Sequence, residues 1–465
     1  MSNLRFPDGF VWGSATSAYQ IEGSPLADGA GMSIQHRYAH MPGNTVDGMT
    51  GDLLADHYRR WPEDIELMKE IGLGAYQFSI AWPRVLPNGR GVVNKHGLDF
   101  YDRLLDALLE AGIRPAPILH VWDYPTALQD RGGWANRESA EWFAEYASVV
   151  FDRLGDREGD WMTLCEPLSI AAGGYIGGLL APRIQDLYAG MRAGHHVLLA
   201  HGRAVEVFRA SGASGTIGTS TGLSSFYPAT DSEADRAAAE RYNLGRNALY
   251  LDPVMRGEYP EGPSDWYGEA WPEIRDGDLE AISAPIDFLG VTYYTSARIA
   301  AGKPLEQRAG ETLGWNPATE AEYDIHLDGH TVPEPDRPST DIDWPINPDG
   351  LYDALLWLRD RYGEMPLVIT EVGAAYDDEV VDGRIEDRAR IEFLADHLRA
   401  AHRAIEAGID LRGCFVWSLL DTWEFWLGCT ARFGLVHIDY ETQERTLKDS
   451  GRWFSAVIAA NGVDG

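Results

Sequence analysis

Lysine is scarce in this sequence. Only four of the 465 residues are lysine, so arginine carries most of the positive charge. The 72 Asp and Glu residues outnumber the 39 Lys and Arg residues, which gives a formal net charge of −33. A field of this sign repels phosphate backbones and anionic lipid headgroups, and therefore argues against a nucleic-acid-binding protein or a membrane-surface protein. We attribute the lysine shortage itself to base composition or salt adaptation.

Cysteines and long apolar runs are also missing. The three cysteines, Cys165, Cys414 and Cys429, form no CxxC pair and no disulfide framework. No apolar run approaches the roughly 18 residues that a membrane span requires. The first ten residues contain no basic segment followed by an apolar stretch, so we expect no secretory signal. The sequence thus predicts a soluble, cytoplasmic protein without membrane or nucleic-acid partners, and it leaves a homo-oligomer open.

Apolar and aromatic residues, in contrast, are abundant. The chain is 45% hydrophobic and contains 16 tryptophans and 21 tyrosines, enough for a large core and for aromatic walls that stack on a flat ligand. Short β-rich runs alternate with helical patterns such as 61–70, 99–111, 193–210 and 388–407. The predicted strands are Phe10–Tyr19, Ala75–Trp82, Arg114–Trp122, Trp161–Cys165, Thr216–Thr221, Asp287–Tyr294, Leu367–Thr370 and Gly413–Ser418.

Eight repeats of strand and helix predict an α/β fold, the closed parallel (β/α)₈ or TIM barrel. We expect one domain over residues 1–465. Because the chain exceeds the usual length of about 250 residues, it must contain long βα loops. Leu223–Arg275 and Ala297–Pro348 are the expected insertions, and in this fold such loops shape the pocket at the C-terminal rim of the barrel.

Two glutamates follow predicted strands on opposite sides of the barrel. Glu166 follows Trp161–Cys165, the fourth strand, and Glu371 follows Leu367–Thr370, the seventh. A carboxylate at the end of a buried strand is costly unless it is paired or functional. One such glutamate alone is more often a salt-bridged rim residue. Two of them facing each other among tryptophans fit glycoside cleavage, which needs one protonated and one ionised carboxyl group.

Longer motifs carry a resemblance to a known family. The chain resembles family 1 glycoside hydrolases, the β-glucosidase type, from Phe6 to about Phe454. The similar stretches occur in the same order along the whole chain. They are Phe10-Val-Trp-Gly-Ser-Ala-Thr-Ser-Ala-Tyr-Gln-Ile-Glu-Gly23, Phe78-Ser-Ile-Ala-Trp-Pro-Arg84, Gly97-Leu-Asp-Phe-Tyr101, Gly132-Gly-Trp134, Leu251-Asp-Pro253, Trp417-Ser-Leu-Leu-Asp421 and Arg432-Phe-Gly-Leu435.

This resemblance implies a retaining mechanism that needs neither a metal nor an organic cofactor. Glu166 would be the general acid/base and Glu371 the nucleophile, with carboxyl groups about 5–5.5 Å apart. Tyr294 would hydrogen-bond the nucleophile. The substrate would be a small-molecule glycoside. The resemblance also implies that Gln20 and Glu424 hold sugar hydroxyls, that Trp417 forms the stacking floor and that Trp344 forms an entrance wall.

The sequence departs from the family pattern around the expected sugar pocket. Cys165 replaces an asparagine that contacts the sugar, and Val121 replaces a histidine that binds a sugar hydroxyl. His120 next to it would compensate only by reorienting. A thiol is a weak donor, and each lost contact to a buried hydroxyl costs about 1–3 kcal/mol. The other residues of interest are Trp122, which is kept, and Thr292, Val372 and Phe425, which replace two asparagines and a tryptophan.

One replacement removes a charge. Gln77 stands where the family has an arginine beside the nucleophile. Without this cation, the pKa of Glu371 should rise, because an opposite charge no longer favours the ionised form. A glutamate that is partly protonated at neutral pH is a weaker nucleophile.

Three functions are compatible with these departures. The first is a retaining β-glycosidase that hydrolyses or transfers a glycoside with fewer sugar hydroxyls, such as a deoxy sugar on a natural product. The second is a repurposed barrel in which Glu166 and Glu371 act as an acid/base pair for cyclisation, isomerisation or elimination on a less polar substrate. The third is a binding protein without turnover, and retention of both glutamates, Tyr294 and Gln20 argues against it. We favour the first.

One further motif involves histidines. His36 and His40 have the i, i+4 spacing that allows two histidines on one helix face to bind zinc. Because no glutamate lies between them and the sequence shows no third ligand, we expect a helix surface or loop and no metal site.

Overall fold

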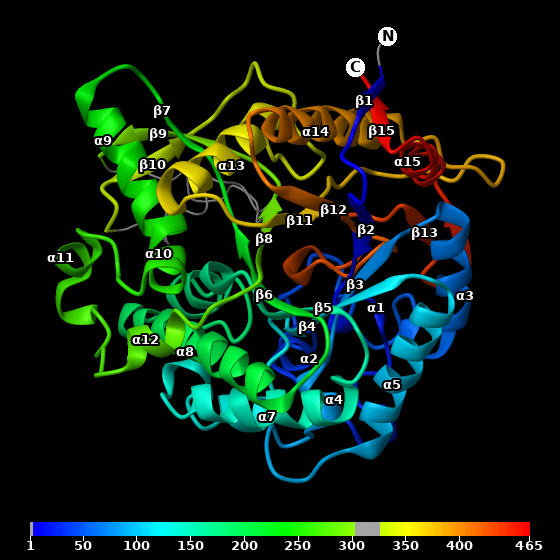
Figure 1. Ribbon diagram of the computed structural model, residues 1–465, viewed down its shortest axis with the longest axis horizontal. Coiled ribbons are helices and arrows are strands. Elements are labelled where there is room, and N and C mark those ends of the chain that lie inside the picture. Colours follow the sequence, from blue (N-terminus) through cyan, green and yellow to red (C-terminus); the bar gives the residue numbers. More distant parts are fainter. Residues whose placement is uncertain (1–2, 303–325) are drawn as a thin grey trace.

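Eight parallel strands close into a barrel in the computed structural model, which describes residues 3–302 and 326–465 (Figure 1). The strand order around the barrel follows the chain, and the last strand pairs with the first. This confirms the predicted (β/α)₈ barrel. The barrel strands are β2 (Val11–Ala15), β3 (Ala75–Ser79), β4 (Arg114–His120), β5 (Asp160–Cys165), β6 (Thr216–Gly222), β8 (Phe288–Tyr293), β11 (Leu367–Val372) and β12 (Leu411–Trp417).

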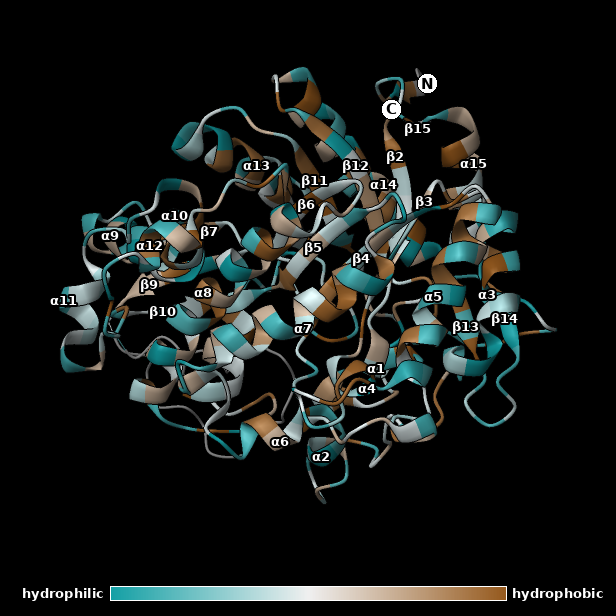
Figure 2. Ribbon diagram, turned by 60° about the horizontal axis from the view of Figure 1, so that its bottom comes forward, coloured by the Kyte–Doolittle hydropathy of each residue, from teal (hydrophilic) through white to brown (hydrophobic). Residues whose placement is uncertain are grey.

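A ring of amphipathic helices surrounds the barrel. In α5 (Lys95–Glu110), for example, Phe100, Leu104, Leu105 and Leu108 form a buried stripe, while the charged residues between them face solvent. Figure 2 shows hydrophobic and hydrophilic residues side by side on such helices. The other long helices of this layer are α3 (His57–Ile71), α7 (Ser139–Leu154), α8 (Leu187–Ser211), α13 (Pro348–Tyr362), α14 (Arg388–Glu406) and α15 (Asp449–Ala460).

Some barrel strands end earlier than the sequence predicts. The first was expected to reach Tyr19, but β2 ends at Ala15 and the chain turns into the short helix α1 (Ala18–Ile21). The turn is held by side-chain chemistry, because Ser79 Oγ accepts a hydrogen bond from the backbone N–H of Ala18 at 2.7 Å. Apolar residues beyond the strand end are therefore buried at the rim rather than in the ladder.

The two predicted insertions meet in a small sheet that the sequence did not reveal. β7 (Phe226–Pro228) belongs to the first insertion, and β9 (Ala297–Ala301) and β10 (Gly329–Val332) belong to the second. They pair in the order β10-β9-β7 beside the barrel (Figure 1). Residues 303–325 of the second insertion lie outside the described residues. Between β7 and β8 lie α9 (Glu233–Tyr242), the π-helix η4 (Asn243–Ala248), α10 (Leu249–Arg256), α11 (Pro263–Tyr267), η5 (Gly268–Ala270) and α12 (Asp278–Ile282).

Short elements complete the rim and the ends of the chain. β1 (Asn3–Arg5) and β15 (Gly462–Asp464) pair antiparallel, so the two ends of the described chain lie side by side (Figure 1). β13 (Val436–Ile438) and β14 (Arg445–Leu447) form another antiparallel pair. The remaining short helices are η1 (Ala27–Gly29), α2 (Ile34–Ala39), α4 (Trp82–Val85), α6 (Thr126–Gln129), η2 (Gly133–Ala135), the π-helix η3 (Ser169–Ile176) and η7 (Phe425–Leu427).

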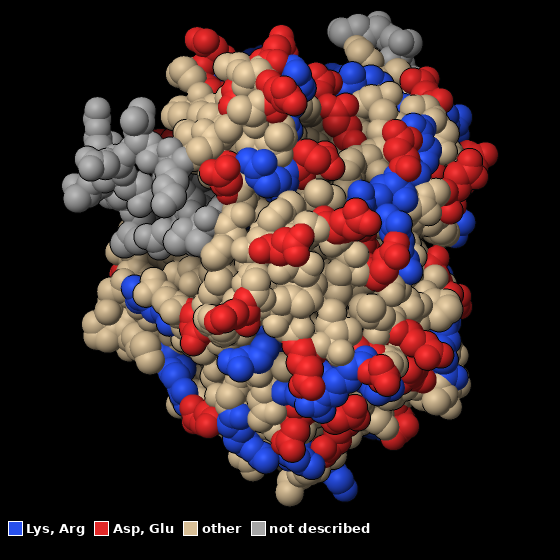
Figure 3. Space-filling view, turned by 90° about the vertical axis from the view of Figure 1, so that its left-hand side faces the viewer, with Lys and Arg blue, Asp and Glu red and all other residues tan. Residues whose placement is uncertain are grey.

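Acidic and basic side chains are mixed on the surface. Figure 3 shows both signs interspersed on the face it presents. Many arginines there and elsewhere pair with carboxylates, as Arg157 does with Asp106 at 3.0 Å. Among the described residues no helix has the length and apolar character of a membrane span. Charges of both signs therefore lie side by side on this face.

Candidate active site

Glu166 lies at the end of β5, where the strand turns toward the helix η3. Its backbone has a positive φ of 50°, which is uncommon for a residue other than glycine and is often found at functional sites. The side chain is buried. Its two carboxylate oxygens each accept a hydrogen bond, Oε2 from Ser169 Oγ at 2.7 Å and Oε1 from the Thr292 hydroxyl. Two hydroxyl groups thus fix the orientation of this carboxylate.

Glu371 lies in β11 on the opposite side of the barrel. The pairing of β11 with β8 shifts register between Ile369 and Glu371, and such irregularities re-aim side chains near active sites. The Tyr294 hydroxyl donates to Glu371 Oε2 at 2.6 Å, and the Cys165 thiol lies 3.6 Å from Oε1. Both oxygens therefore have a neighbour that can donate, one strong and one weak.

The two glutamates lie close together. A carboxylate oxygen of Glu166, one of Glu371 and the sulfur of Cys165 all lie within 4.8 Å of one another. Carboxyl groups about 5–5.5 Å apart allow a direct attack on the sugar, whereas inverting glycosidases leave about 6.5–9.5 Å for a water molecule. The short separation therefore fits the retaining geometry.

Burial raises the pKa values of both glutamates. Burial raises the pKa of Glu371 to about 8, with a further contribution from the charge of Glu166, while the Tyr294 and Cys165 hydrogen bonds act in the opposite direction. Burial also raises the pKa of Glu166, against the hydrogen bonds from Thr292 and Ser169. Because like charges this close resist joint ionisation, the pair retains a proton near neutral pH.

A third carboxylate, that of Glu424, lines the same cavity. Glu424 Oε1 accepts hydrogen bonds from Gln20 Nε2 at 3.1 Å, Trp417 Nε1 at 3.3 Å and Thr422 Oγ1 at 2.5 Å. Burial raises the pKa of Glu424 to about 7. Oε1 is held by these three donors, which fixes the carboxylate in the cavity and leaves Oε2 as the second acceptor for a ligand hydroxyl.

The walls of the cavity are largely apolar. The Trp122 and Phe425 rings lie 4.5 Å apart between centroids and are tilted by 34°, and the Trp344 ring meets Tyr294 edge-on at 5.3 Å. Val121 lies in the same hydrophobic cluster as Trp344. The cavity contains about 1470 Å³ of space, part of it open to solvent. Such aromatic faces suit the apolar face of a sugar ring or a flat aglycone.

The cavity brings together most residues that the sequence singled out. Two of them, Gln77 and His120, do not line it. The cavity is lined by the others, Glu166, Glu371, Tyr294, Gln20, Val121, Trp122, Cys165, Trp344, Trp417, Glu424 and Phe425. His120 instead lies in an aromatic cluster, 5.4 Å from the Trp134 ring, and burial lowers its pKa to about 3. His120 has therefore not reoriented toward the position of Val121.

Gln77 is buried within the barrel wall. Both polar atoms of its amide are without a hydrogen-bond partner in the described part of the chain. A buried polar group without a hydrogen-bond partner lowers the stability of the fold by about 1–3 kcal/mol, so glutamine is an unfavourable residue at this position. The groups that shift the pKa of Glu371 include no cation. The pKa of Glu371 is raised, as the sequence predicted from the loss of the arginine.

Two contacts at Glu166 were not expected from the sequence. Thr292 counted only as a lost asparagine, yet its hydroxyl binds Glu166. Ser169 was not singled out, although its position three residues after Glu166, in the helical turn that follows β5, was a usable signal. Arg246 and Asn247 from η4 also line the cavity and belong to an insertion without a recognisable motif.

Comparison with known proteins agrees with this geometry. The sequence profile described as glycosyl hydrolase family 1 matches residues 2–463. The chain is 46% identical over 466 residues to β-glucosidase A of Thermotoga maritima, covering 100% of both chains. It is 40% identical over 473 residues to a bifunctional β-D-glucosidase/β-D-fucosidase of Bifidobacterium breve, covering 98% of each.

A solved structure gives the same result. The T. maritima β-glucosidase in complex with glucoimidazole superimposes with a TM-score of 0.92 at 45% identity, covering 99% of this chain and 100% of that one. Sequence and fold thus agree along the whole chain. The chain belongs to glycosyl hydrolase family 1 and is a glycoside hydrolase.

Proposed function

We propose that the protein is a retaining β-glycosidase that cleaves or transfers a β-linked small-molecule glycoside, with residues 1–465 as one catalytic domain. The observation that carries this proposal is that one carboxylate oxygen of Glu166 and one of Glu371 lie within 4.8 Å of each other. The similarity to β-glucosidases over the whole chain supports it. So does the likeness to a structure with a sugar-like inhibitor bound.

The first step forms a glycosyl-enzyme. Glu371 attacks the anomeric carbon with one carboxylate oxygen, while Glu166 transfers its proton to the glycosidic oxygen and the C–O bond to the aglycone breaks. Tyr294 holds the other oxygen of Glu371 at 2.6 Å and so orients the nucleophile. The products of this step are the free aglycone, an ester between the sugar and Glu371, and an ionised Glu166.

The second step releases the sugar. Glu166, now ionised, takes a proton from water or from an acceptor alcohol, whose oxygen attacks the anomeric carbon and displaces Glu371. Both carboxyl groups return to their starting protonation states. The hydroxyl groups of Thr292 and Ser169 keep Glu166 in place while it changes charge.

We further propose that the preferred glycone has fewer hydroxyl groups than glucose. Val121 and Cys165 line the cavity and offer at most a weak thiol donor, whereas Gln20, Trp417 and Glu424 form a strongly polar group in the same cavity. A hydroxyl facing Val121 would lose its water without gaining a partner, so sugars that lack it are favoured. The name of the Bifidobacterium relative includes D-fucose, a deoxy sugar with one hydroxyl fewer than glucose.

One observation also supports the repurposed reaction. A Glu371 with a pKa of about 8 in an apolar cavity is mostly protonated at neutral pH, as a general acid would be. In that case Glu371 would form no covalent bond to a sugar.

Trapping with 2-deoxy-2-fluoro glycosides tests both candidates. Incubation with activated fluoro-glycosides of glucose, fucose and other sugars, followed by peptide mass spectrometry, should show a sugar adduct on Glu371. The fastest-labelling sugar identifies the glycone, and Glu371→Gln is the matched control that should remain unlabelled. If none of the sugars labels the protein between pH 6 and 9, the glycosidase mechanism is wrong and the repurposed reaction is favoured.

A further inference from the structure

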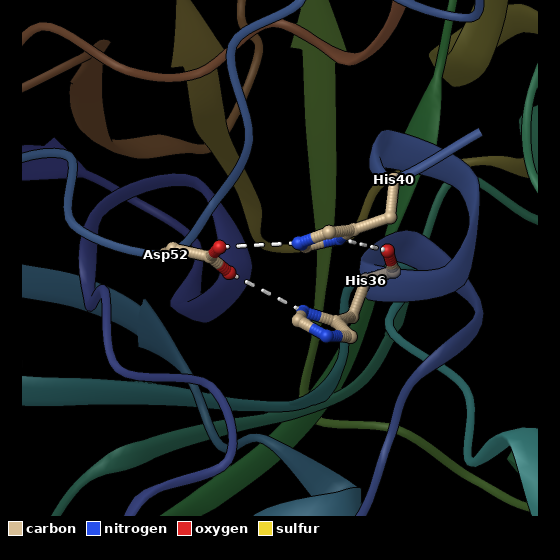
Figure 4. Close-up of side chains that lie close together, drawn as sticks. All are labelled: His36, His40 and Asp52. Atoms are coloured by element: carbon tan, nitrogen blue, oxygen red, sulfur yellow. Dashed lines mark hydrogen bonds and ion pairs between the residues drawn. The ribbon is translucent and has the colours of Figure 1, made fainter. Parts of the chain in front are cut away.

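His36, His40 and Asp52 converge on one point at the rim of the barrel (Figure 4). His36 lies in α2, His40 follows the helix directly, and Asp52 comes from the chain that precedes α3. One ring nitrogen of each histidine and one oxygen of Asp52 all lie within 4.8 Å of one another. The third ligand that the sequence did not show is therefore supplied by the fold.

His36 directs an unpartnered polar atom into this cluster. Its side chain is 10% exposed, and its Nδ1 has no hydrogen-bond partner within the described residues. That atom faces Asp52 Oδ1 at 3.6 Å, too far for a hydrogen bond. An imidazole nitrogen that is buried without a hydrogen-bond partner is available as a metal ligand.

The second histidine is oriented in the way that metal ligands are. His40 Nδ1 lies 2.8 Å from the backbone oxygen of His36, which can only accept, so Nδ1 carries a proton. In a neutral ring Nε2 then has a free lone pair, and it points at Asp52 Oδ2 at 3.1 Å. Two acceptors in contact require a cation between them or a proton on the ring. A backbone carbonyl that holds the other ring nitrogen is the usual support of a metal-bound histidine.

The ligand atoms lie close enough together to contact one ion. Bonds of about 2.0–2.2 Å to zinc place neighbouring ligand atoms about 3.3 Å apart. Each histidine faces a different oxygen of Asp52, His40 Nε2 at 3.1 Å from Oδ2 and His36 Nδ1 at 3.6 Å from Oδ1, and both distances are near this value. We propose that His36, His40 and Asp52 bind a divalent transition-metal ion, with Zn²⁺ the best match to two imidazoles and one carboxylate. The side chains of His40 and Asp52 are 42% and 52% exposed, so water supplies the fourth ligand.

A metal ion here would fasten a loop next to the active site. An ion bound by residues 36, 40 and 52 would link the two ends of the segment between α2 and α3. Val46 in that segment donates its N–H to the oxygen of Trp426 at 2.8 Å, and Trp423 Nε1 donates to the oxygen of Met49 at 3.0 Å. These two tryptophans flank Glu424 on the chain. The proposed ion therefore stabilises the rim loop without entering the sugar pocket.

Titration of the purified, chelator-treated full-length protein with ZnCl₂ tests the proposal. Calorimetry and metal analysis after dialysis should show one Zn²⁺ per chain, and MgCl₂ should not compete. His40→Ala and Asp52→Asn, both at exposed positions, should each weaken binding at least about 10-fold, since even loss of an outer-shell partner costs about 10–100-fold. His96→Ala, at an exposed histidine elsewhere, should bind like the parent.

A second site has to be separated from this one. Cys165, Glu166 and Glu371 also bring ligand atoms within 4.8 Å of one another. Glu371→Gln should therefore keep the proposed Zn²⁺ site, and the Co²⁺-loaded protein should show the visible absorption of a four-coordinate site that His40→Ala removes. Absence of binding at millimolar ZnCl₂ would show that His40 and Asp52 form only a protonated ion pair. Binding that survives in His40→Ala and Asp52→Asn would also overturn the proposal.

Discussion

The sulfur of Cys165 lies 3.6 Å from Oε1 of Glu371, between the two carboxylates that perform the proposed reaction. A thiol is a weak donor, so this position gives little support to the carboxylate or to a sugar hydroxyl. The burial that isolates it, together with the two nearby carboxylates, raises the pKa of the thiol well above its usual value. Cys165 is therefore an uncharged, poorly donating neighbour where an amide would be a strong one.

Replacing this thiol by an amide should improve glucoside cleavage. Cys165→Asn introduces an N–H donor, and one charge-assisted hydrogen bond contributes about 1.5–3 kcal/mol, or roughly a tenfold gain or more. We expect kcat/KM for an aryl β-glucoside to rise by that factor from a low parental value. Cys165→Ala removes the thiol without adding a donor and should not gain. An unchanged rate in the asparagine variant would mean that the donor is not what limits glucose.

Adding a cation beside the nucleophile should shift the pH profile. The parent needs an ionised Glu371, whose pKa is raised to about 8, so kcat/KM should fall as the pH drops below that value. In Gln77→Arg the new positive charge favours the ionised form, and the acidic limb should move down by about 1–3 pH units. Gln77→Met, which adds no charge, is the control. An acidic limb that stays near pH 8 in the arginine variant would separate Gln77 from the titration of Glu371.

Azide rescue should distinguish the two glutamates. Glu371→Gly removes the nucleophile, so azide attacks the sugar directly and gives the glycosyl azide of inverted configuration. Glu166→Ala still forms the glycosyl-enzyme from an activated substrate, and azide then gives the retained product. The configuration is read by NMR of the isolated azides. Exchanged outcomes would reverse the assignment of acid/base and nucleophile.

A buried ion pair behind Glu424 should dominate local stability. Lys448 Nζ contacts Asp421 at 2.7 Å, and both side chains are fully buried. Burial by itself would raise the pKa of Asp421, but the charges of Lys448 and Arg432 outweigh it and lower the pKa to about 2. Lys448→Met leaves this carboxylate without its main partner, so we expect a loss of about 3–5 kcal/mol in the free energy of unfolding at pH 7.

The pH dependence of this pair follows from the direction of the shift. Because the folded pKa of Asp421 lies below the unfolded value of about 3.9, its contribution is present above pH 4 and disappears as the pH falls toward 2. Denaturant unfolding of the parent should show this loss, and Lys448→Met, in which only Arg432 still pairs with Asp421, should show a smaller one. Lys69→Met, at an exposed pair worth about 0–1 kcal/mol, is the matched control. Equal stability of the two variants would contradict the role of the buried pair.

Some residues of the site could be placed from the sequence and others could not. Glu166 and Glu371 were accessible to sequence reasoning, because Glu166 directly follows one short apolar strand, Glu371 lies near the end of another, and parallel strands end on one rim. His120 was not, because the strand ends there and its ring turns into the aromatic cluster around Trp134 instead of the pocket. Beyond a strand end the alternation of side chains no longer tells which way a residue faces.

The sequence alone thus determined the barrel and the two strands whose ends hold the proposed catalytic glutamates, since both depend on local alternation of apolar strands and amphipathic helices. Tertiary structure decided what these residues touch. Thr292 reaches Glu166 across 126 positions, and Asp52 reaches His40 from a separate loop. Such contacts follow from the closure of the barrel and the packing of its loops, for which no nearby pattern in the chain exists.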